Sequence, residues 1–313
     1  MEIIEADWKE YEKLIPQPYH VFGSAAFNQS NEDRCEKAYY LLFKDSKYRL
    51  GMIAGVRNNN LYSPYSAPFG GFSFLHDDVR INVIDEALQL LSNWATEEKI
   101  AAVKITLPPN IYQDSFVAKQ VNSLFRNQFV IDKADLNYAY HLENFDDEYQ
   151  QSIWYNAKKN LKIALSNELI FSIAQSGIER ETAYNIIRQN REARGFPLRM
   201  TWPQVQRSVA LMPTDFFIVK NKEGIDVAAA VIFHVAKDIV QVIYWGDLPQ
   251  YAPLKTMNFL SFKVFEYYKS KGIKIVDIGP STEDSIPNYG LCEFKESIGC
   301  KISCKFSFNK NIA

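Results

Sequence analysis

The stretch from Asp277 to Gly299 holds the residues whose types and spacing could do chemistry. Asp277 lies near the end of a strand-like run, and Tyr289 and Lys295 follow after a turn. A carboxylate there can orient an amine or act as a base, and a phenol can supply a proton. Each residue also has a simpler interpretation, as a turn-capping carboxylate, a packed tyrosine and a solvated surface lysine.

The elements that must position these residues occur in an order that the chain uses twice. Each copy has three strand-like runs, an amphipathic helix and a closing strand. In the first copy these cover residues 39–43, 48–56, 61–74, 81–98 and 101–107; in the second they cover 216–219, 227–233, 239–245, 254–271 and 273–278. Two copies are too few for a solenoid, so the pattern predicts two related domains, 1–146 and 147–313.

Several antiparallel strands followed by a helix and a further strand indicate α+β domains. Each domain is expected to have a mixed, mostly antiparallel sheet flanked by helices. Ligands favour clefts at domain interfaces, so we expect the site between the two domains. Outside the repeats, apolar spacing predicts helices over 7–15, 113–129, 146–167 and 179–194, strands over 139–142 and 168–173, and a helix after Thr201.

Composition excludes several classes of function. The net charge of −2 gives no overall field that would attract DNA, although it leaves room for a local basic groove. The N-terminus lacks the apolar core of a signal peptide, and the longest apolar run, Val227 to Ala236, is too short to span a bilayer. We therefore expect a cytoplasmic protein without membrane insertion.

Metal and common nucleotide motifs are absent from the sequence. The four cysteines fit no standard zinc spacing, and the four histidines are scattered singly, so no metal is predicted. Neither GxGxxG after a strand nor GxxxxGK[ST] occurs, which weighs against the Rossmann and P-loop folds.

The order βββ–α–β resembles the GNAT superfamily, the acyl-CoA N-acyltransferase fold. The segment Gly290-Leu-Cys-Glu-Phe-Lys-Glu-Ser-Ile-Gly299 also resembles the ending of GNAT-like proteins that include the FemABX peptidyltransferases and BioF2-like acetyltransferase domains. The telling element is Phe294-Lys295 in its frame of glycines. Tandem GNAT domains occur in that superfamily, and the basic segments Trp154–Ala164 and Arg188–Gly195 are similar to helices that follow its first domain.

This resemblance implies an N-acyltransferase that moves an acyl group from acyl-CoA to an amine of a small molecule or of a cell-envelope or polysaccharide precursor. Coenzyme A or acetyl-CoA would be the co-substrate, without a metal. The resemblance implies that Lys295 meets the acyl donor or the developing negative charge, beside the candidate catalytic residues Tyr289 and Asp277. It also implies donor binding by Tyr244, Trp245, Gln250, Leu254, Lys255 and Phe294. The usual pyrophosphate loop is degenerate here, because Gln250-Tyr-Ala-Pro-Leu-Lys255 has neither glycine and Pro253 lacks an N–H.

Two further segments could hold the acceptor. Tyr65, Phe69 and Gly70 lie in an aromatic and glycine-rich stretch that could form an acceptor-binding loop or merely a bulged strand. Arg191 and Arg194 share one side of a helix and could hold phosphates or form an ordinary solvated face.

Two other functions stay open. The chain could be a FemABX-type aminoacyl-tRNA-dependent peptidyl transferase, in which case tRNA would be a partner; the missing coiled-coil arm and the near-neutral charge weigh against it. Alternatively, the degenerate loop could indicate a catalytically inactive GNAT-like binding module.

Overall fold

A computed structural model of the 313-residue chain describes residues 1–196 and 198–312. The chain forms two compact units. Unit 1 comprises Met1–Leu136, Thr282–Ile286 and the stretch that begins at Ser303, and unit 2 comprises Asn137–Ser281 and Pro287–Ile302. Both units are therefore discontinuous in sequence. The division into domains 1–146 and 147–313 stays a prediction.

The sheet of unit 1 has the strand order β1-β2-β3-β4-β6-β15, and β5 pairs with β3. β4 and β6 run parallel, and the other neighbours in this order are antiparallel. The strands are β1 (Glu2–Ala6), β2 (Lys37–Lys44), β3 (Tyr48–Arg57), β4 (Asn60–Ser63), β5 (Phe72–Phe74), β6 (Ala102–Thr106) and β15 (Lys301–Asn311).

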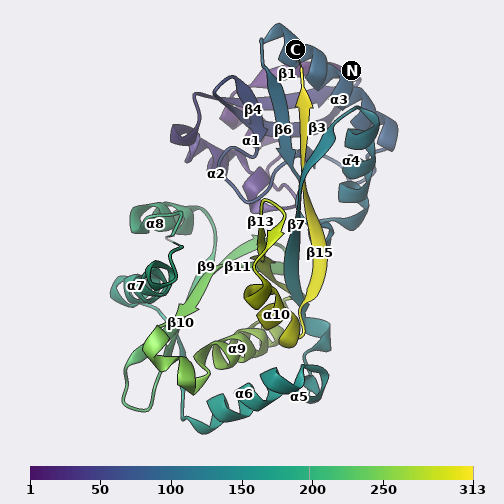
Figure 1. Cartoon of the computed structure of the whole chain (residues 1–313). Coiled ribbons are helices and arrows are strands. Elements are labelled where there is room, and N and C mark those ends of the chain that lie inside the picture. The colour runs from purple at the N-terminus through teal and green to yellow at the C-terminus, as the bar shows by residue number, and fades with distance from the viewer. Residues whose placement is uncertain (197, 313) are drawn as a thin grey trace. The chain divides into compact units, whose positions relative to one another are not determined.

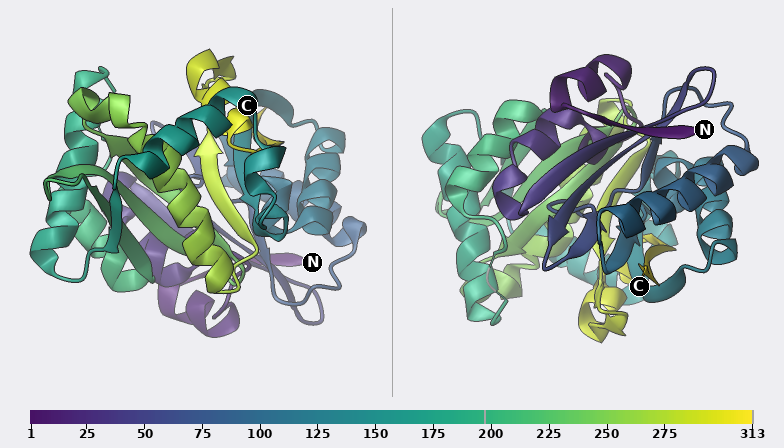
Figure 2. Two further views of the ribbon diagram at one scale, coloured as in Figure 1. Left: turned by 90° about the horizontal axis from the view of Figure 1, so that it is seen from below. Right: turned by 90° about the horizontal axis from the view of Figure 1, so that it is seen from above.

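Helices cover both faces of this sheet, α1 and α2 on one side and α3 and α4 on the other (Figures 1 and 2). They are α1 (Trp8–Leu14), α2 (Ala25–Gln29), α3 (Ile81–Glu97) and α4 (Asp114–Arg126), with 3₁₀ turns η1 (Val21–Gly23), η2 (Glu32–Arg34) and η3 (Asn110–Tyr112). In β2, Leu41 packs in the core beneath α3, whereas its neighbours Tyr40 and Leu42 pack in the core beneath α1. Burial on both faces explains why this strand reads as one apolar run.

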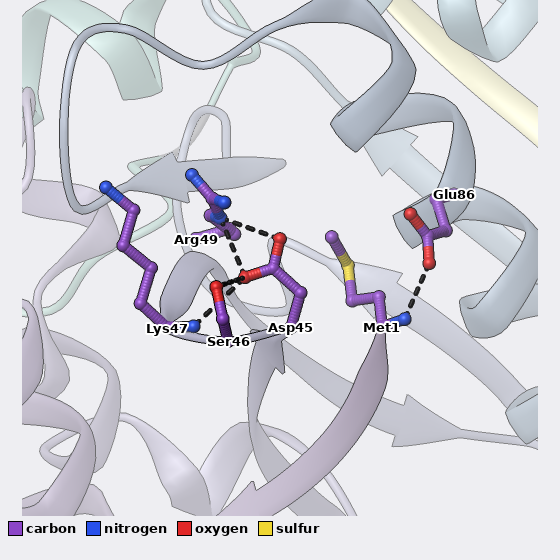
Figure 3. Close-up of polar contacts among 6 residues, drawn as sticks. All are labelled: Met1, Asp45, Ser46, Lys47, Arg49 and Glu86. Atoms are coloured by element: carbon purple, nitrogen blue, oxygen red, sulfur yellow. Dashed lines mark hydrogen bonds and ion pairs between the residues drawn. The ribbon is translucent and has the colours of Figure 1, made fainter.

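Polar contacts near the turn between β2 and β3 secure the edge of this unit (Figure 3). The carboxylate of Asp45 accepts hydrogen bonds from Arg49 Nε at 2.9 Å and from the Lys47 amide at 3.0 Å. The amino group of Met1 lies 2.6 Å from Glu86 of α3. The pKa of the Asp45 carboxyl is held below its usual range, chiefly by Arg49.

The sheet of unit 2 has the order β7-β12-β11-β10-β9-β8. Only its β11–β12 pair is parallel. The strands are β7 (Val130–His141), β8 (Ile170–Ile173), β9 (Thr214–Lys220), β10 (Asp226–Ala236), β11 (Ile239–Asp247) and β12 (Ile275–Pro280), and a small hairpin of β13 (Thr282–Glu283) and β14 (Ile286–Pro287) follows. β7 begins in unit 1 and ends in unit 2.

In unit 2, α7 and α8 lie on one side of β9–β11 and α9 lies on the other, with α6 packed against α9 (Figure 1). The helices are α5 (Tyr149–Ser152), α6 (Tyr155–Ser166), α7 (Gly177–Ala193), α8 (Trp202–Leu211), α9 (Thr256–Ser270) and α10 (Tyr289–Ser297), with 3₁₀ turns η4 (Leu142–Asn144) and η5 (Pro249–Leu254). In β9, Phe216 contacts Trp202 of α8, whereas Phe217 contacts Tyr267 and Tyr268 of α9. This alternation buries both faces.

Both predicted repeats are confirmed as three strands, a helix and a parallel strand, and each domain-like half is α+β. Two predicted elements are wrong. The continuous strand over 61–74 is interrupted between β4 and β5, where Pro64 and Pro68 cannot donate to a ladder. The helix over 146–167 is broken at Trp154, whose amide donates to the carbonyl of Ser297 instead of continuing a helix.

Across the described ranges 1–196 and 198–312, no helix combines the length and apolar character needed to cross a membrane. Within those same ranges, no three His, Cys, Asp or Glu side chains gather in a way that could hold a metal ion.

Candidate functional site

The parallel strands of unit 2 separate at the position of Asp277. Their ladder pairs Ile239 with Ile275 and ends at Gln241 opposite Asp277. β11 then continues against β10 through a bulge that leaves Ile243 unpaired, whereas β12 continues against β7. We call this branch, with the side chains around it, the unit 2 junction.

Asp277 is fully buried at the junction, and hydrogen bonds satisfy its carboxylate. Oδ1 accepts from Asn137 Nδ2 at 2.8 Å and from the amide of Gly279 at 2.9 Å. Oδ2 accepts from Gln241 Nε2 at 2.7 Å. A buried carboxylate requires such donors, because water no longer solvates it. The three donors come from β7, β11 and β12, so the carboxylate holds these strands together where the ladder divides.

Lys295 lies in the last turn of α10 and is only 2% exposed. Its Nζ donates to the carbonyls of Ile278, Gly279 and Pro280, at 3.1, 2.8 and 3.1 Å. An ammonium group has three N–H donors, and these carbonyls use all of them. Burial lowers the pKa of Lys295 to about 8, against the opposing effects of Cys300 and Asp277. The side chain thus fixes the turn that follows Asp277.

Two aromatic residues of the predicted donor site contact each other in unit 2. The rings of Trp245 and Phe294 lie edge to face, with centroids 6.2 Å apart. Because Trp245 is on β11 and Phe294 is on α10, the contact joins the separated strand to the helix that carries Lys295. Tyr244 is also on β11; its hydroxyl accepts from the amide of Met200 at 3.2 Å, and burial raises its pKa.

Arg191 of α7 is partly buried, and its guanidinium makes no hydrogen bond or ion pair within residues 1–196 and 198–312. Burial lowers its pKa, Tyr244 opposes this shift, and the neighbouring positive charges of Arg194 and Arg199 add to it. Arg194 is more exposed and lies 3.9 Å from Asp247. The end of α7 therefore carries more positive charge than nearby carboxylates neutralise, which favours a bound anion.

The predicted pyrophosphate segment forms the 3₁₀ turn η5 ahead of α9. Gln250 is exposed in this turn, Leu254 ends it, and Lys255 has a left-handed φ of 58°. The hydroxyl of Thr256 donates to Asp247 Oδ2 at 2.7 Å, which ties the start of α9 to the end of β11. The segment is therefore compact without the glycines of the usual loop.

Three of the predicted acceptor residues lie in unit 1, where the chain leaves β4. Tyr65 is 3% exposed and donates to the carbonyl of Asn28, and Phe69 is fully buried. The amide of Gly70 donates to the carbonyl of Thr106 at 2.8 Å. Tyr289, predicted as an acid, is 78% exposed at the start of α10. The roles assigned to these four residues stay predictions.

The structure thus groups Asp277, Lys295, Trp245 and Phe294 within unit 2. Sequence reasoning missed Asn137 and Gln241. The latter left a signal, since it is the one polar side chain in the run Ile239-Val-Gln-Val-Ile243. Asn137 left none, because it is distant in sequence and lies in a strand with several polar residues.

No protein-family model and no curated protein sequence matches this chain. Solved structures do. FemX aligns with a TM-score of 0.71 and 13% identity over 99% of this chain and 97% of that one. L-PGS from Bacillus licheniformis aligns with a TM-score of 0.61 and 14% identity, over 97% of this chain and 92% of that one. A tandem GNAT protein from the clavulanic acid biosynthesis pathway aligns with a TM-score of 0.56 and 9% identity, over 100% of this chain and 98% of that one. The chain therefore has the α+β fold of the tandem GNAT and FemX-like proteins, with two GNAT-like halves whose sheets are flanked by helices.

Proposed function

We propose that the chain is an N-acyltransferase that transfers an acyl group from acyl-CoA to an amine of a small molecule or of a cell-envelope or polysaccharide precursor. The observation that carries this proposal is the buried Asp277–Lys295 arrangement at the junction of a GNAT-like half. Buried charges are expensive to maintain, and perturbed ionisable groups cluster at functional sites. The position of the site relative to the two units stays part of the proposal.

The site offers positive charge to an anionic donor, but it lacks the glycine loop of the family. In the described part of the chain Arg191 has no ion pair, and Lys255 precedes α9, so both could place positive charge near the phosphates of a donor. The glycine loop is missing, and Pro253 removes a donor. Arg191, Arg194 and Lys255 would hold the phosphates, and Trp245 and Phe294 would line the acyl arm, together with Tyr244, Gln250 and Leu254.

In the proposed reaction the amine nitrogen attacks the thioester carbonyl carbon. A C–N bond forms, the C–S bond breaks, and one amine proton passes to the departing thiolate. Asp277 would orient the amine, and the buried positive charge of Lys295 would stabilise the negative charge that develops on the carbonyl oxygen. Because its three N–H groups are already donated to backbone carbonyls, Lys295 acts here through its charge and by fixing the turn. Tyr289 remains the proposed acid: its hydroxyl gives a proton to the leaving thiolate and takes one from the amine nitrogen, so the amine proton reaches the thiolate through it.

Isothermal titration with acetyl-CoA tests the donor. We expect saturable binding by the wild type and about tenfold weaker binding by Arg191→Ala, the effect of losing a contact of roughly 1.4 kcal/mol. Arg188→Ala is the matched control, because Arg188 lies on the same helix, is exposed and lies 3.8 Å from Glu192. Absence of binding to the wild type at millimolar acetyl-CoA would remove this donor. A thermal-shift screen of acyl-CoA compounds then identifies the acyl group.

A specific observation supports the alternative of an aminoacyl-tRNA donor. Lys159 and Lys162 are exposed on α6, Lys158 is half-buried, and this helix contains no acidic residue. RNA binding draws on such unneutralised lysines. If Lys158→Ala combined with Lys159→Ala leaves tRNA mobility in a gel-shift assay unchanged, this alternative is weakened. A GNAT-like module without catalysis is the remaining alternative, and loss of turnover in a folded Lys295 variant would count against it.

A further inference from the structure

Gln241 carries a buried acceptor that no donor meets. The residue is 4% exposed, and its Nε2 donates to Asp277 Oδ2 at 2.7 Å. Its Oε1 is buried and has no hydrogen-bond partner in the described part of the chain. Buried polar atoms in folded proteins are nearly always paired, so an orphaned acceptor at a candidate site indicates a missing donor.

The orientation of this amide is set by chemistry. A carboxylate only accepts hydrogen bonds, so the end of the amide that faces Asp277 must be the NH₂ group. Reversing the amide would place two acceptor oxygens 2.7 Å apart. Oε1 therefore has to face away from the carboxylate. A serine hydroxyl in the same position could donate as well as accept a hydrogen bond, whereas this carbonyl oxygen can only accept one.

The place of Gln241 in the fold connects this acceptor to the reaction. Gln241 and Asp277 form the last pair of the parallel ladder, so the orphaned oxygen lies where β11 and β12 separate. The neighbouring carboxylate adds negative charge to the same spot. An acceptor oxygen beside a buried negative charge favours an N–H donor that is cationic or becomes so.

We infer that Gln241 Oε1 receives an N–H of the acceptor amine, which makes Gln241 a substrate-binding and specificity-determining residue. This rests on the proposed function for its place in a reaction, but the binding itself needs no acyl donor. A primary amine offers an N–H to Oε1 while its charge lies next to Asp277. A quaternary ammonium ion has no N–H and cannot do both.

Methylammonium and tetramethylammonium chloride, compared at equal concentration without acyl-CoA, test the inference. Both are monovalent cations, but only methylammonium has N–H donors. A ligand that binds the folded state raises the midpoint of thermal unfolding by mass action. We expect methylammonium to raise the wild-type midpoint above that in tetramethylammonium, with the difference increasing with concentration. Equal midpoints in the two salts would overturn the inference without any variant being needed.

Variants locate the effect. Gln241→Met keeps the length of the side chain and removes Oε1, so the difference between the two salts should vanish. Asn137→Leu removes another donor to Asp277 but leaves Oε1, and the difference should persist. If both variants lose it, Asp277 and not Gln241 is responsible, and the inference fails. It also fails if a crystal soaked in methylammonium shows a water at Oε1 that the amine does not displace. Failure of acetyl-CoA to bind would refute the proposed donor while leaving this result unaffected.

Discussion

Each unit contains one pair of parallel strands that separate at one end, but different side chains surround the two branch points. In unit 1, β4 and β6 pair from Asn60 opposite Ala102 to Ser63 opposite Ile105. The chain then turns back, and Gly70 donates to Thr106 of β6. Phe69 fills the turn with a fully buried ring that lies 4.7 Å from Tyr112. The branch of unit 1 is therefore filled by its own uncharged side chains, the apolar Phe69 together with the buried Ser63 and Gln120, whose oxygens accept from the amides of Gly71 and Phe72.

In unit 2 the corresponding branch is lined by buried charged groups. Asp277 and Lys295 are both nearly inaccessible to solvent, and the Oε1 of Gln241, like the Nε2 of Gln120 in unit 1, has no hydrogen-bond partner in the described part of the chain. A protein interior retains such groups when geometry or function requires them, since apolar side chains of similar volume are often at least as stabilising. The difference makes unit 2 the better candidate for the proposed site.

Replacing the buried lysine gives the largest expected difference between the halves. Lys295→Met leaves three carbonyls without their charged donor, so we expect the free energy of unfolding to fall by about 3 kcal/mol and acyl transfer to fall roughly 100-fold or more. Lys310→Met in unit 1 is the control: Lys310 makes one hydrogen bond to Ser92, at 3.0 Å, and should cost about 1 kcal/mol with turnover unchanged. Urea unfolding and release of free thiol from acetyl-CoA measure both. Wild-type turnover in Lys295→Met would remove unit 2 as the catalytic half.

Removing one aromatic ring from each branch sharpens the comparison. Phe69→Ala empties a packed site and should cost about 3–5 kcal/mol, whereas Phe294→Ala loses an edge contact with Trp245 worth about 1 kcal/mol. Binding of acetyl-CoA should respond in the reverse order, with Phe294→Ala about tenfold weaker and Phe69→Ala unchanged below its unfolding temperature. Titration calorimetry with thermal unfolding on the same samples separates the two effects. If Phe69→Ala abolishes binding while folded, the aromatic stretch of unit 1 belongs to the site.

The order of elements could be predicted from sequence because strands and helices leave local patterns. Leu88 and Leu91 of α3, for example, recur with helical spacing on its buried face. β15 could not be predicted in the same way. Most of its side chains are only partly buried, and its partner is distant, with Phe308 opposite Ile105. The break after β4 depends on how the intervening loop packs, which no local pattern encodes.

The same limit applies to the site. Lys295 could be proposed from its motif, but its role as a donor to three carbonyls depends on where α10 packs. The pairing of Asp277 with Gln241 spans 36 residues, and its pairing with Asn137 spans 140. Contacts over such separations follow from the sheet order, and a single sequence does not specify that order.

The lowered pKa of Lys295 predicts how stability depends on pH. Its ordinary pKa is 10.5 and its folded pKa is about 8, so between these values the unfolded chain binds more protons than the folded one. Stability contributed by this group should therefore rise as pH increases from about 8 to 10.5, by about 3 kcal/mol in total. The raised pKa values of buried tyrosines act in the opposite direction, so the quantity to measure is the difference between wild type and Lys295→Met in urea unfolding across that range. A difference that is independent of pH would contradict the burial of a titrating lysine at the junction.

Replacing a glycine at each branch should give the smallest difference in the free energy of unfolding between the two units. Gly71 and Gly279 both have positive φ, 89° and 74°, so alanine should cost about 1–2 kcal/mol of backbone strain at either position. At Gly279 an added Cβ meets nothing within 4 Å, so strain is the whole expected cost. At Gly71 it would lie 2.7 Å from Leu107 Cδ2 and 3.0 Å from Gln120 Oε1, and overpacking adds about 1–3 kcal/mol. Chemical denaturation of Gly71→Ala and Gly279→Ala checks the ranking. Equal losses, or a larger loss at Gly279, would mean that the branch of unit 2 is packed as tightly around its glycine as that of unit 1, and this contrast between the two branches would fail.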